Sequence, residues 1–114
     1  MGDVYSFDPA AAHSAHEDTI LAAPVLPEDF AAPFDHAWGY LKGRGMMDAH
    51  RHPDKNEFYV FTQGEGFAIL DGAKHPVKAG SIVLVRENVL HSVANETDAP
   101  LCWAAFWWKN PTRK

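Results

Sequence analysis

From residue 36 onward, apolar and polar residues alternate in short segments separated by turn residues, a pattern that predicts strands. The Asp71-Gly72 pair between two such segments is typical of a tight hairpin turn. We expect strands at residues 38–42, 46–50, 58–63, 67–70, 74–78, 81–85, 90–95 and 101–108, with 81–85 a short buried strand. Short strands at this spacing, without alternating helices, predict an all-β sandwich or barrel.

The first 35 residues follow a different pattern. Asp8 is placed to cap a helix whose first residue is Pro9, and the alanine-rich sequence beyond predicts a helix to about Ala22. Prolines then predict an extended loop, at Pro24, Pro27 and Pro33. A chain of 114 residues has room for one domain, so we expect an N-terminal extension, 1–35, packing on a barrel formed by 36–110.

The last expected strand, residues 101–108, is apolar on both faces, whereas a half-solvated strand would alternate. Two explanations are open. Either the N-terminal segment buries the second face, or a second copy of the chain covers it. A homodimer is therefore the default expectation.

Composition excludes several classes of function. The formal net charge of −5 argues against a nucleic-acid partner, because such proteins need a basic face. No apolar run approaches the roughly 18–20 residues that span a bilayer, and no secretory signal is recognisable, so we expect no membrane partner. The one cysteine, Cys102, lies in an apolar run and fits a packed side chain in a reducing, cytoplasmic environment.

Seven histidines are many for this length, and three of them are spaced for chemistry. His50 and His52 are two residues apart, so on an extended chain their rings share one face and can bind one ion. Glu57 begins the next strand, and His91 lies on a later one. Three imidazoles and one carboxylate suit Fe, Mn, Ni, Co or Cu, and Zn less obviously, and leave positions open for substrate.

These residues stand in motifs that resemble those of the cupin superfamily of small jelly-roll barrels. The first motif is matched by Gly45, His50, His52, Glu57 and Gly64, with the leading glycine one position closer than usual. The second is matched by Gly80, His91 and Asn95, with Arg86 in place of proline and Asn88 in place of glycine. The likeness covers about residues 38–107. It implies a jelly-roll barrel with a metal ion bound at its centre by His50, His52, Glu57 and His91.

Other residues are candidates for the substrate pocket. Tyr59, Phe61 and Gln63 share the face of Glu57 by the two-residue period, although plain core packing explains Phe61 equally well. Trp103 is expected to face the cavity on one side of its strand. Arg86 is a candidate anion clamp, whereas Arg51 points away from the two histidines beside it. His13 and His16 are interpreted as a solvated helix face, and His36 and His75 have no ligand-spaced partners.

The first functional hypothesis is a transition-metal-dependent enzyme acting on a small organic molecule, an oxygenase or an isomerase or lyase. The resemblance includes dioxygenases, sugar isomerases and small lyases, and Tyr59 and Glu87 are candidate proton carriers. The alternative is a non-catalytic cupin that binds or senses a sugar-like small molecule. Retention of all four ligand positions favours the enzyme, because a pure binding cavity does not need them.

Overall fold

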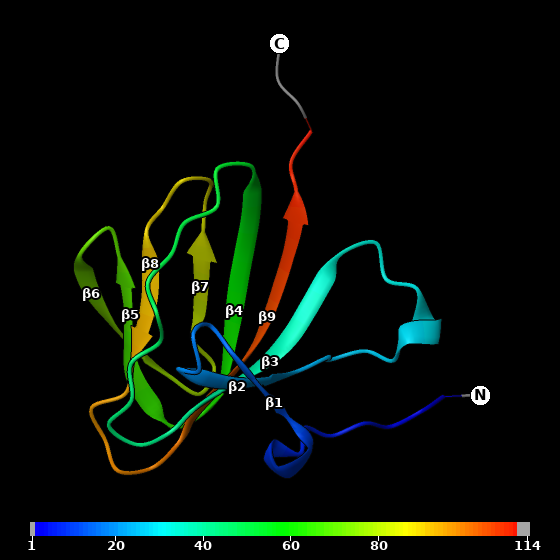
Figure 1. Cartoon of the computed structure of the whole chain (residues 1–114), viewed down its shortest axis with the longest axis horizontal. Helices are drawn as coiled ribbons and strands as arrows, with labels where there is room; N and C mark the ends of the chain where they lie inside the picture. Colours follow the sequence, from blue (N-terminus) through cyan, green and yellow to red (C-terminus); the bar gives the residue numbers. More distant parts are fainter. Residues whose placement is uncertain (1, 112–114) are drawn as a thin grey trace.

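The computed structural model describes residues 2–111. In this range the chain forms antiparallel strands in two sheets, with two single turns of 3₁₀ helix, η1 (Pro9–Ala11) and η2 (Glu28–Phe30) (Figure 1). The strands are β1 (His13–Ala15), β2 (Ile20–Ala23), β3 (Asp35–Leu41), β4 (Lys55–Gln63), β5 (Glu65–Leu70), β6 (Ala73–Lys78), β7 (Ile82–Val85), β8 (His91–Ala94) and β9 (Leu101–Lys109). The predicted all-β barrel is confirmed.

Two sheets enclose one core. The larger has the order β1-β2-β3-β9-β4-β7 and the smaller the order β6-β5-β8. Long strands β4 and β9 pair side by side at the centre of the larger sheet, where the alternating side chains of each face the smaller sheet. The most deeply buried apolar side chains lie between the sheets: Leu41, Met47, Phe61, Val93, Leu101 and Trp103.

The predicted hairpin at Asp71-Gly72 is confirmed. Both residues have positive φ, 47° and 86°, as a two-residue turn between right-twisted strands requires. The Asp71 carboxylate also accepts a hydrogen bond from the Leu90 N–H at 2.9 Å. The turn is thereby tied to the segment that leads into β8.

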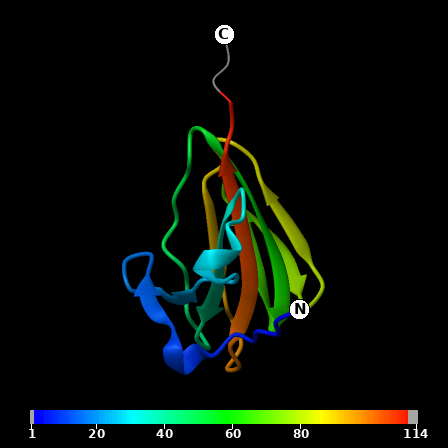
Figure 2. The same cartoon turned by 90° about the vertical axis from the view of Figure 1, so that its right-hand side faces the viewer.

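The predicted helix from Asp8 to Ala22 is wrong beyond its first turn. Asp8 does cap η1, accepting a hydrogen bond from the Ala10 N–H at 3.0 Å. The chain then becomes extended, and β1 and β2 form a hairpin that continues the larger sheet, with β2 paired to β3. Pairing with the sheet overrides the weak helix preference of the alanines. Figure 2 shows this hairpin projecting to one side of the barrel, next to the loop that precedes β4.

Two further expectations are corrected. Residues 46–50 form no continuous strand, because only Met46 and His50 make isolated bridges, to Ala94 and His91. Strand β7 is at the edge of the larger sheet and is buried on one face alone, since Ile82 and Leu84 are 64% and 55% exposed.

The outer face of the larger sheet is apolar, as the sequence of β9 predicts. Phe7 of the N-terminal segment stacks on Trp38 with ring centroids 5.6 Å apart, so this segment covers the β3 side of the face. Farther along, Phe58 stacks on Phe106, and Trp108, Ile82 and Leu84 are exposed. Within residues 2–111 no helix is long and apolar enough to cross a membrane; the cytoplasmic location stays a prediction.

Asn95, just after β8, joins the end of β3 and the loop that follows it to the loop before β9. Its buried side chain donates hydrogen bonds to the carbonyls of Leu41, Lys42 and Ala99, and its oxygen accepts from the backbone and hydroxyl of Thr97. One amide thus satisfies backbone groups from two separate loops.

We predict that Asn95→Ala lowers the free energy of unfolding by at least about 2 kcal/mol, because several buried groups lose their partner. Chemical denaturation checks this. Glu96→Gln, at the exposed neighbouring position, is the control and changes stability by less than about 0.5 kcal/mol. Equal effects of the two variants would contradict the role assigned to Asn95.

Candidate metal centre

Four side chains from different parts of the chain converge inside the barrel. His50 and His52 lie on the loop between β3 and β4, Glu57 on β4 and His91 at the start of β8. One ligand atom from each residue lies within 4.8 Å of the others. The backbones of His50 and His91 are joined by two hydrogen bonds of 3.1 and 2.9 Å, which fix the loop against the smaller sheet.

Backbone carbonyls orient two of the imidazoles. Nδ1 of His50 lies 3.1 Å from the Asp48 carbonyl oxygen, and Nδ1 of His91 lies 2.9 Å from that of Val89. Because a carbonyl oxygen can only accept, each Nδ1 carries the hydrogen and Nε2 keeps its lone pair in the neutral ring. This second hydrogen bond is the usual way in which a metal-binding histidine is held.

The contact between His91 and Glu57 calls for a cation. Nε2 of His91 lies 3.2 Å from Oε1 of Glu57, but the two do not have hydrogen-bond geometry, and both atoms are buried without any hydrogen-bond partner. Two buried acceptors that face each other are costly unless a positive charge lies between them. A single proton could be shared by Glu57 and His91 alone, whereas a metal ion could also bind the ring nitrogens of His50 and His52.

The donor set fits a divalent transition metal. Ligands on opposite sides of an ion at about 2.1 Å each are about 4.2 Å apart, close to the spread of these four atoms. Three nitrogens and one carboxylate oxygen suit several first-row ions and do not select one.

Burial changes the acid–base behaviour around the cluster. It lowers the pKa of His52, with the positive charges of His50, His91 and Lys55 acting in the same direction and Glu57 opposing them. Burial, followed by the negative charge of Glu57, raises the pKa of Tyr59 well above its ordinary value. The Tyr59 phenol is therefore a neutral hydroxyl at physiological pH.

A cavity of about 200 Å³ opens beside the cluster. Its walls are mostly apolar and aromatic, and its residues are His16, Ile20, Ala22, Ala37, Trp38, Gly39, Met47, His50, His52, Lys55, Glu57, Tyr59, Trp103, Ala105 and Trp107. Gly39 makes room for this wall, because a Cβ there would overlap the indole of Trp103. A larger cavity of about 710 Å³ lies between the N-terminal segment and residues 23–36, and none of the four convergent residues lines it.

The expected pocket residues divide into two groups. Tyr59 and Trp103 line the cavity. Phe61 is packed in the core below it, with its ring centroid 5.6 Å from that of Trp103. Gln63 departs from the expected face because a bulge between Phe61 and Gln63 adds one residue to β4 and places Gln63 opposite Cys102, on the outer face.

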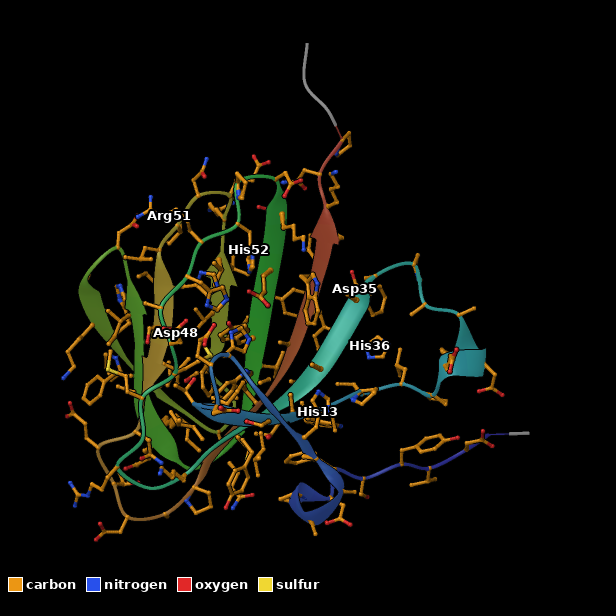
Figure 3. The ribbon with its side chains drawn as sticks, viewed as in Figure 1. His13, Asp35, His36, Asp48, Arg51 and His52 are labelled. Carbon is orange, nitrogen blue, oxygen red and sulfur yellow. The ribbon has the colours of Figure 1, made fainter. Side chains whose placement is uncertain are left out.

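Neither arginine borders the cavity. Arg86 is exposed and does not line it, in contrast to the expected clamp, and Arg51 points outward from the loop while His52 points toward β4 (Figure 3). Asn88, two residues after Arg86 in the second motif, has a φ of 64°, the left-handed conformation expected of an asparagine in place of glycine.

The sequence did not indicate the two basic side chains that line the cavity beside the cluster, His16 and Lys55. His16 belongs to the turn between β1 and β2, and although exposed to solvent its ring lies 4.5 Å from that of His50. The sequence analysis placed His16 on a predicted helix, and so it did not predict the contact between His16 and His50. Lys55 is two residues before Glu57 on β4. The two-residue period of the strand, which placed Tyr59 on the face of Glu57, therefore places Lys55 on that face as well.

The remaining histidines lie away from the cluster. His13 and His75 are exposed. Nδ1 of His36 accepts hydrogen bonds from the N–H groups of Val25 and Leu26 at 3.0 and 3.3 Å, so His36 fastens the proline-containing loop to β3 (Figure 3).

The fold and the cluster together define a small antiparallel barrel that gathers three imidazoles and a carboxylate, a group able to hold a metal ion, beside an apolar cavity. The family model for the cupin domain matches residues 38–108, and the chain therefore belongs to the cupin family.

Solved structures show the same fold. A cupin 2 conserved barrel domain protein from Salinispora arenicola is 24% identical, with a TM-score of 0.83 over 96% of this chain and 90% of that one. A protein from Photorhabdus luminescens is 20% identical, with a TM-score of 0.81 over 96% and 89%. A protein from Thermotoga maritima described as a predicted oxalate decarboxylase is 24% identical, with a TM-score of 0.71 over 79% and 80%.

We predict that His91→Ala lowers metal affinity more than about tenfold, since even loss of a group that merely orients a ligand costs that much. Metal content is measured by elemental analysis after purification without chelator and after reloading. His13→Ala, an exposed histidine outside the cluster, is the control and keeps the wild-type content. Equal losses in both variants would show that the wrong cluster was chosen.

Proposed function

We propose that the protein is a transition-metal-dependent enzyme that acts on a small oxygen-bearing organic molecule, with His50, His52, Glu57 and His91 as the metal ligands. The observation that carries this proposal is the buried, unpartnered contact of Glu57 Oε1 with His91 Nε2, inside a cluster of four ligand atoms. Oxygenation, or isomerase or lyase chemistry next to a carbonyl, fits such a centre.

A bound metal supplies Lewis acidity and a template on which an oxygen-bearing substrate is oriented. The side chains of the cavity exclude water and hold the substrate. The indoles of Trp103 and Trp107 form an apolar wall that keeps water from the substrate. The Tyr59 hydroxyl, kept protonated by its surroundings, donates a hydrogen bond to a substrate oxygen, whereas Glu87 does not line the cavity.

The cavity limits the substrate to small molecules. At about 30 Å³ for each water in the liquid, a volume of about 200 Å³ holds roughly seven waters. Short diketones, thiols and hydroxy acids fit this space more readily than uronates. The Thermotoga relative, described as a predicted oxalate decarboxylase, supports small substrates of this kind.

A turnover panel tests the enzyme against the alternative of a sugar-like binding or sensor protein. Metal-loaded protein is incubated with diketones, catechols, thiols and uronates while oxygen uptake and products are followed. We expect turnover of at least one small member and a loss of at least about tenfold in Glu57→Gln. Tight binding of a panel member with no conversion of any would favour the alternative.

We also propose a homodimer, formed through the outer face of β4, β9 and β7. Phe58, Phe106, Trp108, Ile82 and Leu84 form an apolar surface there, and Val60 and Ala104, which lie among them in the strand register, are uncharged as well. Two copies with a net charge of −5 repel each other, so an uncharged patch is where they approach most favourably. A twofold axis brings the same patch from both copies together.

Leu84→Glu is predicted to convert the dimer into a monomer, because it places a charge in the apolar surface that this contact buries. Light scattering coupled to gel filtration measures the mass across micromolar concentrations. His75→Glu adds the same charge on the exposed face of β6 and leaves the dimer intact. A wild-type protein that is monomeric at all concentrations would overturn the homodimer.

A further inference from the structure

Lys55 brings a positive charge to the wall of the metal cavity. It is the first residue of β4 and shares the inner face of that strand with Glu57 and Tyr59. Its side chain is half-buried and lines the cavity of about 200 Å³. Its charge also contributes to the lowered pKa of His52, which places it within electrostatic reach of the cluster.

Within residues 2–111, no carboxylate forms a salt bridge with Lys55. The adjacent carboxylate, Asp54, lies 3.5 Å from Nζ of Lys109 instead. Lys109 is also the residue directly opposite Lys55 on β9, so two lysines face each other across the strand pair, an unfavourable arrangement by itself. A positive charge on a half-buried side chain that lines a mostly apolar cavity is stabilised by a counter-charge.

The local charge differs in sign from that of the whole chain. The protein carries a net charge of −5, whereas the ionic groups at the cavity are Lys55, Glu57 and, by the proposed function, a divalent cation. Of these, only Glu57 is negative. The cavity therefore retains about two positive charges when loaded, and its apolar walls strengthen their field.

We propose that Lys55 binds the carboxylate of the substrate, so that this enzyme acts on small carboxylic acids that also present an oxygen to the metal. The inference rests on the proposed function and adds the substrate class to it. The small cavity favours a carboxylate over a bulkier phosphate ester. Neither arginine competes for this role, since Arg51 and Arg86 lie outside the cavity.

The test compares acids with their neutral amides of the same shape: lactate with lactamide, and malonate with malonamide. Binding to the cobalt-loaded full-length protein is measured by calorimetry and by the visible spectrum of the cobalt centre. In the wild type, at least one acid is expected to bind more tightly than its amide. Lys55→Met is expected to weaken the binding of that acid at least about tenfold, the usual loss for a hydrogen bond to a charged group. The affinity for the amide is expected to change less than about twofold.

Two further variants show whether the effect is specific. Lys55→Arg keeps the charge and is expected to restore most of the acid affinity. Arg86→Met removes a positive charge outside the cavity and is expected to change neither ligand more than about twofold. Equal losses for acid and amide in Lys55→Met would mean that Lys55 only supports the structure, and an unchanged acid affinity would equally overturn the proposal.

Metal content, measured first in every variant, separates this inference from the proposed function. A wild-type protein that takes up no cobalt overturns both. A loaded wild type that binds neither acid overturns the role of Lys55 and leaves the metal centre standing. Lysine-dependent binding without turnover of any substrate supports Lys55 and contradicts the enzyme.

Discussion

The buried contact between Glu57 and His91 is the constraint on which the rest of the site depends. The Val89 carbonyl turns the lone pair of the His91 ring toward Oε1 of Glu57, a buried oxygen that accepts no hydrogen bond. The fold holds this unfavourable pair in place through the hydrogen bonds that join the backbones of His50 and His91. A site that keeps two acceptors together at a cost to stability is arranged for a cation, and the imidazoles of His50 and His52 complete its surroundings.

The N-terminal hairpin belongs to the same arrangement. The Thr19 hydroxyl donates to the His16 carbonyl at 2.5 Å and accepts from the Asp48 N–H at 2.9 Å. The Asp48 carbonyl in turn accepts from the His50 ring. The turn that carries His16 is therefore fastened to the loop that orients the His50 ring, and a shift of the hairpin would move His50 as well.

The sequence predicted most of the barrel and the four convergent residues, because alternation and motif spacing are local signals. Its failures have long-range causes. Residues 13–23 are helix-prone locally, yet they form a hairpin whose second strand, β2, pairs with β3, and its turn brings His16 beside His50. The bulge after Phe61 reverses the face of Gln63, which a strict two-residue period does not reveal. Arg86 is close to His91 along the chain, but the turn containing Asn88 leaves it exposed.

Strand β4 presents three polar side chains to the cavity in a fixed order along its length. Its inward positions are about 7 Å apart, so one strand presents the Lys55 ammonium, the Glu57 carboxylate and the Tyr59 hydroxyl in sequence, with Phe61 packed in the core below. A shift of register by one residue would turn all of them outward. The bulge lies beyond Phe61, after the last group that the site uses, and so the strand bends without disturbing this order. In a cavity this small, the spacing along one strand does much to decide which molecules reach the four convergent residues and this hydroxyl together.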